Sequence, residues 1–354
     1  MRPDARAGRR HRGRCGLMSG LRCDVLTTNS AALDAIDRLF GSAINETLFH
    51  HPRFLSYHGA DKFPDAQWRH YLFSWNGSPV AFLPGAVTNG GDPTFHSPLG
   101  SSHGGLVHEA LSYAKLDECL NLWWEDIKGL GCTRAEIVLA PAPYWEEAAY
   151  SEAIEFKLNQ LGFVLRQPEL CLIVPIEADP DFPRHLVRAS AWRNAKQALT
   201  RGVTVRHSAQ FTADLERFYP ILADNRKRFG ATPTHSCTEL LRIHDLAPEG
   251  MHLFLATADA DALAGILAFQ ATPSVLNAFY PADSPRGRDL RAMDLLLVEL
   301  YRWALEHSIR WVDLGPSSFR LMLNMTLTRF KESHGGQTFL RRRYVWNRSN
   351  EDRR

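Results

Sequence analysis

The segment MHLFLATADADALAGILAFQATPSVLNAFY, residues 251–280, contains three apolar runs separated by two short turns. The runs are Met251–Thr257, Ala262–Ala271 and Val275–Tyr280. Apolar runs of this length, bounded by Asp, Ala, Pro and Ser, predict three consecutive strands joined as an antiparallel meander. A meander of this kind is expected to form the centre of a sheet.

Helices and strands alternate on both sides of this meander. Periodic apolar positions predict helices where residues recur at three- and four-residue spacing, and strands where short apolar runs occur. Before the meander we expect strand Val203–His207 and helices Thr212–Phe229 and Cys237–Leu246. After it we expect helix Arg291–His307, strand Arg310–Leu314, helix Phe319–Lys331 and a terminal strand near Gln337–Trp346.

The first half of the chain shows the same order of elements. Its clearest feature is a hairpin, Trp68–Trp75 and Val80–Val87, because Asn76-Gly77 between apolar runs is a strong turn signal. A strand at Leu21–Thr27 and a helix with Ser30 as N-cap precede the hairpin. The remaining expected elements are helices Pro52–Gly59, Lys115–Gly129 and Tyr150–Leu161, and strands Ala135–Ala140, Phe163–Arg166 and Leu170–Ile176.

Both halves therefore follow the order β-α-α-β-β-β-α-β-α-β, which predicts an α/β fold with a mixed sheet and helices on both faces. Each half has about 150 residues, an ordinary domain size. The expected division is a basic tail (1–20), a first domain (21–177), a linking helix (178–202), a second domain (203–347) and a short tail (348–354).

Composition limits the class of protein. The net charge of +2 includes six arginines and one aspartate in residues 1–20, so the rest of the chain is slightly acidic and is not a basic nucleic-acid platform. The Arg- and Gly-rich tail predicts disorder, and residues 1–20 are expected to be dispensable for folding and catalysis. A basic tail can also bind RNA or a membrane surface; the alternative is that Met18 is the true initiator. The six cysteines form no C-x-x-C pair, and no run of about 18 apolar residues occurs. We expect a cytoplasmic protein with reduced thiols, no metal site and no membrane insertion.

Several motifs in the second half, together with the element order, resemble those of the FemAB-like acyltransferases, which are tandem GCN5-related N-acetyltransferase (GNAT) proteins. The most specific is Phe330-Lys-Glu-Ser-His-Gly-Gly336, in which His334 replaces the usual aromatic residue. The other matching motifs are Arg193-Asn-Ala-Lys196, Asn225-Arg-Lys-Arg-Phe-Gly230, Leu263-Ala-Gly265, Tyr280 and Asp313-Leu-Gly-Pro-Ser317. In the first half, the loop Ser97–Val107 is similar to the family's acceptor-side loop.

The resemblance implies transfer of an acyl or aminoacyl group to an amine. The implied donors are acyl-CoA, an acyl-carrier thioester or an aminoacyl-tRNA, with no tightly bound cofactor. The acceptor would be a small molecule or a peptide, and a carrier protein or tRNA is a candidate partner. The helical arm that several cell-wall members insert in the second domain is absent here. The sequence identifies neither donor nor acceptor.

The resemblance assigns catalysis to three residues of the second half. Lys331 would stabilise the oxyanion that develops on the acyl carbonyl, whereas a surface lysine at a helix C-terminus is the structural alternative. Asp313 ends an apolar strand at its carboxyl end, where open α/β sheets place their sites, and would act as general base or contact substrate; its alternative is to cap the turn that follows. Tyr280 would meet the acyl group, unless it is an ordinary strand aromatic.

Other residues are candidates for binding. Arg288 or Arg291, with Phe330, would hold the donor, although the R-x-x-G-x-G/A spacing typical of CoA users is not kept. Asn225, Arg193, Ser102 and His103 would line the acceptor side. For the residues on loops and helices, the alternative to a binding role is an exposed position on a solvated loop or helix face. The first half is expected to contact the acceptor. An isolated second half, provided that it is soluble, is expected to retain donor binding without transfer.

Two other functions stay open. A GNAT-like domain can lose catalysis and serve as a binding module, which the irregular phosphate loop would fit. Gly100-Ser-Ser-His-Gly104 also satisfies the G-x-S-x-G pattern of hydrolases, with Ser102 as nucleophile. That elbow requires a strand before the serine and a helix after it, and the sequence predicts no helix there. A serine hydrolase is therefore only a minor alternative.

Overall fold

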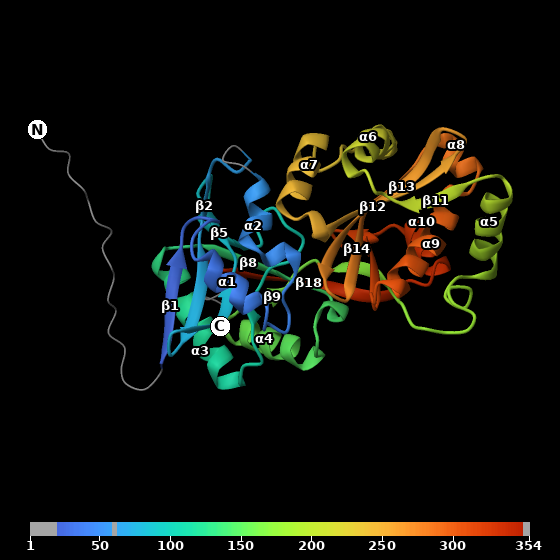
Figure 1. Ribbon diagram of the computed structural model, residues 1–354. Helices are drawn as coiled ribbons and strands as arrows, with labels where there is room; N and C mark the ends of the chain where they lie inside the picture. Colours follow the sequence, from blue (N-terminus) through green and yellow to red (C-terminus); the bar gives the residue numbers. More distant parts are fainter. Residues whose placement is uncertain (1–19, 59–61, 350–354) are drawn as a thin grey trace, which may run out of the picture.

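The computed structural model describes residues 20–58 and 62–349 (Figure 1). The basic tail lies almost entirely outside the described residues, as does the end of the short C-terminal tail. The first half contains helices α1 (Leu33–Phe40), α2 (Pro52–Leu55), α3 (Tyr113–Gly129) and α4 (Ala148–Gln160). Its strands are β1 (Leu21–Leu26), β2 (Ala66–Trp68), β3 (His70–Trp75), β4 (Ser78–Leu83), β5 (Ala86–Thr88), β6 (Thr94–Ser97), β7 (Val107–His108), β8 (Arg134–Leu139), β9 (Val164–Leu165) and β10 (Glu169–Pro175).

The second half follows the expected order with two additions. Its helices are α5 (Ala189–Thr200), α6 (Phe211–Lys227), α7 (Cys237–Leu246), α8 (Pro285–Asp289), α9 (Ala292–Glu306) and α10 (Met325–Ser333). Its strands are β11 (Thr204–His207), β12 (Met251–Ala258), β13 (Asp261–Thr272), β14 (Val275–Asp283), β15 (Trp311–Pro316), β16 (Ser318–Phe319), β17 (Met322–Leu323) and β18 (Gln337–Asn347). The additions are α8 and the hairpin β16–β17.

One large mixed sheet runs through both halves. Its strands lie in the order β11-β12-β13-β14-β15-β10-β18-β8-β6-β5-β2, with β9 beside β18. The fold class expected from the sequence, a mixed α/β sheet, is confirmed. A second sheet, β1-β3-β4-β7, belongs to the first half and contains the predicted Asn76-Gly77 hairpin, whose two turn residues both have positive φ.

The two halves exchange their last strands. Strand β10, at the end of the first half, pairs with β15 of the second half, and β18, at the end of the chain, pairs with β8 of the first half. The strands β10 and β18 also pair with each other, so that they join the two halves at the middle of the sheet (Figure 1). The expected boundary near residue 177 follows the sequence repeat, but no gap in the sheet corresponds to it.

Alternation along the central strands explains why helices cover both faces. On β12, Leu253 and Leu255 pack in the core that contains α6, whereas Phe254 and Ala256 pack in the core that contains α5 and α9. The first of these cores continues across the strand exchange to Trp123 and Trp346. In Figure 1, α6 and α9 accordingly lie on opposite sides of the meander.

Three local expectations were wrong. Ser30 does not cap α1, because the helix begins after Ala32, which has a left-handed conformation and no capping side-chain bond. The helix expected over Phe319–Lys331 begins only at Met325, because Asn324 accepts a hydrogen bond from the Leu327 N–H and caps it there. The linking segment 178–202 is helical only over α5.

Candidate functional site

The site is built where two parallel strands separate. Strands β14 and β15 pair from Val275–Trp311 to Asn277–Asp313, and no further pairing between them occurs in the described residues. Strand β14 then continues to Asp283, while β15 continues to Pro316 and pairs on its other side with β10. Beyond this point the backbone groups of the two strands are no longer paired with each other.

Asp313 lies at the point of separation and is fully hydrogen-bonded. Its Oδ2 accepts from the Tyr144 hydroxyl (2.7 Å) and from the Asn277 side-chain amide (3.0 Å), and its Oδ1 accepts from the Gly315 N–H (2.7 Å). Burial and the adjacent carboxylate hold the pKa of Tyr144 well above its ordinary value, so the phenol stays a donor. Because these bonds occupy both oxygens, the geometry favours a positioning role for Asp313 over the general-base role.

Lys331 is buried beside this network. Its Nζ donates to the backbone carbonyls of Gly315 (2.8 Å) and Pro316 (2.9 Å), which end β15. An ammonium has three donors, and no acceptor for the third N–H is found among the described residues. Burial lowers the Lys331 pKa to about 8, and the Asp313 carboxylate partly opposes this. The lysine is therefore mostly charged at pH 7, which fits a stabiliser of oxyanion charge and excludes the surface-lysine alternative.

Tyr280 belongs to a second network on the far part of β14. Its hydroxyl bonds to His235 Nδ1 (2.8 Å), and His235 Nε2 bonds to the Tyr57 hydroxyl (2.7 Å) from the first half. Burial lowers the pKa of His235 to about 4, so the imidazole is neutral at physiological pH. The Arg226 guanidinium lies over the Tyr280 ring, 5.4 Å from its centroid. Tyr280 is thus more than an ordinary strand aromatic, because it links the halves beside the site.

The segment after β14 does not form an open phosphate cradle. Arg288 donates to the Asp283 carboxylate at 2.9 Å, and Arg286 is paired with Asp259 and Asp261. Asp294 stands in the first turn of α9, so its carboxylate occupies the positive end of the helix. Arg291 caps that helix from an exposed position and forms no ion pair within the described part of the chain. Of the two predicted donor arginines, only Arg291 is therefore free to meet an anion.

The remaining second-half candidates surround the site without joining it. Asn225 donates to Asp283 (3.2 Å) at the end of β14. Phe330, beside Lys331, is partly exposed, and its ring lies 4.4 Å from that of His334. Arg193 is exposed on α5, on the opposite face of the sheet from α6, and no contact places it near Lys331 within the described residues.

The first-half loop reaches the same place through His103. The His103 ring is fully buried, and it lies edge-on to Tyr144, with ring centroids 4.7 Å apart. Neither ring nitrogen has a hydrogen-bond partner in the described structure, and burial lowers its pKa well below the ordinary value. Ser102 is half-buried in a loop between β6 and β7, with no helix after it. The nucleophile elbow of a hydrolase is therefore not formed.

The first half contains an equivalent strand separation that is closed by its own loop. Strands β6 and β8 pair in parallel as far as Ser97–Ile137, and the Gly104 N–H then bonds to the Val138 carbonyl (2.8 Å). The Gly105 N–H bonds to the Ser97 hydroxyl (2.9 Å). A Cβ at Gly104 would lie 2.3 Å from the Ser97 carbonyl carbon, so the fit requires glycine. This loop occupies the backbone positions that a donor would use.

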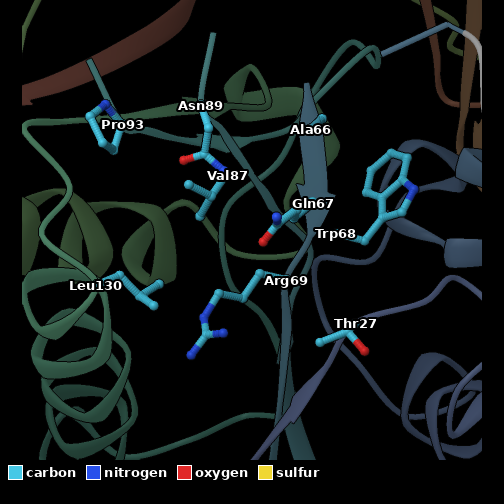
Figure 2. Close-up of a pocket in the computed structure, with 9 residues that line it drawn as sticks. All are labelled: Thr27, Ala66, Gln67, Trp68, Arg69, Val87, Asn89, Pro93 and Leu130. Atoms are coloured by element: carbon cyan, nitrogen blue, oxygen red, sulfur yellow. The ribbon is translucent and has the colours of Figure 1, made fainter. Parts of the chain in front are cut away.

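A cavity of about 400 Å³ lies elsewhere in the first half, and Figure 2 shows its lining. Arg69 is its charged residue, but it is bonded to both oxygens of Asp126 (2.7 Å each). None of the residues predicted for the site lines this cavity. Its volume alone therefore does not make it the reaction site.

Sequence reasoning missed Tyr144, Asn277, His235 and Arg226. Asn277 was the most detectable, because it is a buried polar residue within an apolar strand. Tyr144 and His235 lie in Pro-containing loops that give no periodic signal. Tyr144 lies 169 residues from Asp313 in the chain, and His235 lies 178 residues from Tyr57.

Comparison with known proteins agrees with this geometry. Residues 186–331 match the family model for the acetyltransferase (GNAT) domain, which includes β14, β15 and Lys331. No curated protein matches the chain. The fold is similar to that of FemX, at 15% identity and a TM-score of 0.66, over 93% of this chain and 99% of that one. It is similar to that of a tandem GNAT protein from the clavulanic acid biosynthesis pathway, at 12% identity and a TM-score of 0.51, over 93% of this chain and 98% of that one. It is also similar to the C-terminal domain of a putative lysylphosphatidylglycerol synthetase from Agrobacterium fabrum, at 13% identity and a TM-score of 0.57, over 91% of this chain and 93% of that one.

These likenesses extend over nearly the whole length of each neighbour, so the fold of the complete chain is that of a FemAB-like tandem GNAT protein. The resemblance drawn from the sequence is confirmed. At identities of 10–15% the likeness concerns the fold alone.

Proposed function

We propose, starting from the GNAT-type acetyltransferase domain in residues 186–331, that the protein transfers an acyl or aminoacyl group from an activated donor to an amine acceptor where β14 and β15 separate. The observation that carries the proposal is the buried Lys331 ammonium, held by the carbonyls of Gly315 and Pro316 with one N–H to spare. A buried, oriented charge is worth far more to a developing oxyanion than a solvated one.

The reaction would proceed by attack of a neutral amine on the acyl carbonyl carbon. A C–N bond forms, the bond from that carbon to the donor's sulfur or oxygen breaks, and the amine proton is lost while the leaving group gains one. Lys331 would stabilise the oxyanion. Asp313 would hold Tyr144, Asn277 and the Gly315 N–H in place, so that the end of β15 keeps its shape during the reaction.

The donor is best sought among acyl-CoA, acyl-carrier thioesters and aminoacyl-tRNA. Ion pairing of Arg286 and Arg288 argues against a preformed CoA pyrophosphate loop, and Arg291 is the remaining cation there. The likeness to a lysylphosphatidylglycerol synthetase domain, whose name points to lysyl transfer, supports keeping an aminoacyl donor among the candidates. The tandem GNAT neighbour, whose title mentions AcCoA, supports keeping a CoA thioester.

A second candidate is a non-catalytic binding module. The paired arginines and the fully bonded Asp313 would fit a site that binds a ligand without turning it over. The uncommitted N–H of Lys331 favours catalysis, because a purely structural lysine would be expected to use its third donor.

Native mass spectrometry of protein purified from its host would test the proposal. We expect a co-purified thioester, carrier protein or tRNA, and turnover of that donor when amines are added. Hydrogen exchange with the donor bound should protect 278–283 and 314–316. Protection of 94–97 and 134–139 instead would assign the donor to the first half, and binding without turnover would favour the non-catalytic module.

A further inference from the structure

Exposed apolar side chains gather on one hairpin beside the site. We call the hairpin face the five residues Phe319, Leu321, Met322, Leu323 and Met325, which are 43% to 76% exposed. They come from β16, the turn after it, β17 and the first residue of α10. Elsewhere in the described chain the large exposed apolar residues stand alone or form smaller groups, such as Tyr113 of α3 and Phe156 of α4, whose ring centroids are 6.0 Å apart. An apolar cluster of this kind marks a contact surface for another molecule.

The hairpin geometry presents these residues together. Phe319 is paired directly across the ladder from Met322, so their side chains are neighbours on one face. The turn residues Arg320 and Leu321 both have left-handed backbone conformations, with φ of 47° and 66°. Non-glycine residues adopt this conformation only at an energetic cost. The protein thus keeps an arginine and a leucine at a tip where Asn-Gly would be more stable.

Two exposed arginines, Arg320 and Arg329, lie on or next to the hairpin face. Residues 317–331 contain Arg320, Arg329 and Lys331 and no acidic residue. Arg320 and Arg329 form no ion pair within the described residues; the Arg320 guanidinium lies over the Phe319 ring, 5.2 Å from its centroid. Beneath Phe319, a hollow of about 250 Å³ is lined by three arginines and two glutamates, the arginines being Arg134, Arg320 and Arg343. Arg134 and Arg343 are paired with Glu136, so Arg320 and Arg329 are the exposed, unpaired cations beside the apolar side chains within the described residues.

We propose that the hairpin face docks on a lipid surface with anionic headgroups. Apolar residues at a protruding tip insert at the boundary of headgroups and acyl chains, and flanking arginines contact lipid phosphates. None of the helices in residues 20–58 and 62–349 is long and apolar enough to span a bilayer.

The hairpin connects directly to the reaction site. It begins after Pro316, whose carbonyl accepts from Lys331, and it ends at Asn324, which caps the helix that carries Lys331. The Ser317 N–H bonds to the Leu170 carbonyl and anchors the hairpin on β10. Docking through this face would hold the site at the membrane surface, within reach of substrates that partition into lipid.

Vesicle co-sedimentation of the full chain tests the proposal without any substrate. We expect binding to vesicles of phosphatidylcholine with phosphatidylglycerol, and weaker binding to phosphatidylcholine alone. Met322→Ser should weaken binding to both roughly ten-fold, since the variant loses apolar surface that docking would bury. Arg320→Gln should weaken binding only to the anionic vesicles, by about five-fold. Leu199→Ser, at a similarly exposed leucine on α5, is the matched control and should bind like the unaltered protein.

Three outcomes would overturn the proposal. The first is that the unaltered protein binds neither kind of vesicle. The second is that Leu199→Ser weakens binding as much as Met322→Ser does. The third is a lipid-free dimer, seen by light scattering, that Met322→Ser converts to a monomer; the hairpin face would then be a contact between two copies of the chain. Unchanged thermal unfolding of each variant, expected because these side chains are exposed, separates loss of docking from loss of folding.

Discussion

Replacement of Lys331 by methionine separates catalysis from stability at the proposed site. The fall of the Lys331 pKa from 10.5 to about 8 corresponds to about 3 kcal/mol by which the buried ammonium is disfavoured, a cost that methionine removes. The two hydrogen bonds to Gly315 and Pro316 contribute about 1.5–3 kcal/mol each, and the variant loses both. Because these effects oppose each other, we expect the free energy of unfolding to change by no more than about 3 kcal/mol.

Catalysis should respond much more strongly. Loss of one oxyanion-stabilising donor typically lowers the rate by about 10²–10³-fold, so kcat should fall that far in Lys331→Met while the protein still unfolds cooperatively in urea. The assay is steady-state transfer to the amine with the donor identified by mass spectrometry. A folded variant with near-full turnover would refute the oxyanion role and leave Lys331 a structural residue.

The same lysine predicts a pH dependence with a definite sign. Transfer should rise with pH as the acceptor amine loses its proton, and should fall above about pH 8 as Lys331 loses its charge. Because the folded-state pKa lies below the unfolded value, the stability of the unaltered protein relative to Lys331→Met should rise between pH 8 and 10.5, by up to about 3 kcal/mol. Lys331→Arg, if active, should lose the alkaline fall. An alkaline fall that persists in that variant would assign it to another group.

Three further predictions concern the framework of the site. Tyr144→Phe should lower the free energy of unfolding by roughly 1.5–3 kcal/mol in urea, because the Asp313 carboxylate loses its shortest side-chain donor; an unchanged value would mean that the bond is not formed in solution. Gly104→Ala should cost roughly 1–3 kcal/mol, since the new Cβ meets the Ser97 backbone, and a calorimetric melting temperature equal to that of the unaltered protein would contradict the close approach. A fragment of residues 178–354 should not fold alone, because β10 is missing between β15 and β18; a cooperative, monomeric fragment would disprove this.

Local chemistry allowed most elements to be predicted from the sequence. The Asn76-Gly77 turn and the meander at 251–280 have periodic apolar runs and turn residues, and the structure has strands at both places. Helix α7 begins and ends where its pattern predicted, since Ser236 and Glu239 form a capping box. The segment at 319–323 was mistaken for helix because Phe, Leu and Met are frequent in both kinds of element, and only the position of Asn324 reveals where the helix begins.

The candidate site could be predicted only in part. Lys331, Asp313 and Tyr280 were predicted from motifs. The structure places all three on or beside the separating strands, and their catalytic roles stay predictions. Their partners Tyr144 and His235 could not be found, because they come from loops whose place in space depends on the whole sheet. Arg288 was predicted as a donor contact from its charge, and the sequence did not reveal that Asp283 pairs with it.

The strand exchange explains why the site draws on both halves. Strand β10 leaves the first half, lies against β15 and supports the end of β15 where Gly315 and Pro316 hold Lys331. Strand β18 returns the chain from that lysine to the first half. Each half therefore completes the other's sheet next to the reacting position, and Tyr144 reaches Asp313 across that junction. A repeat of two similar folds thus forms one continuous sheet, in which only the second strand separation stays open because the loop at Gly104 fills the first.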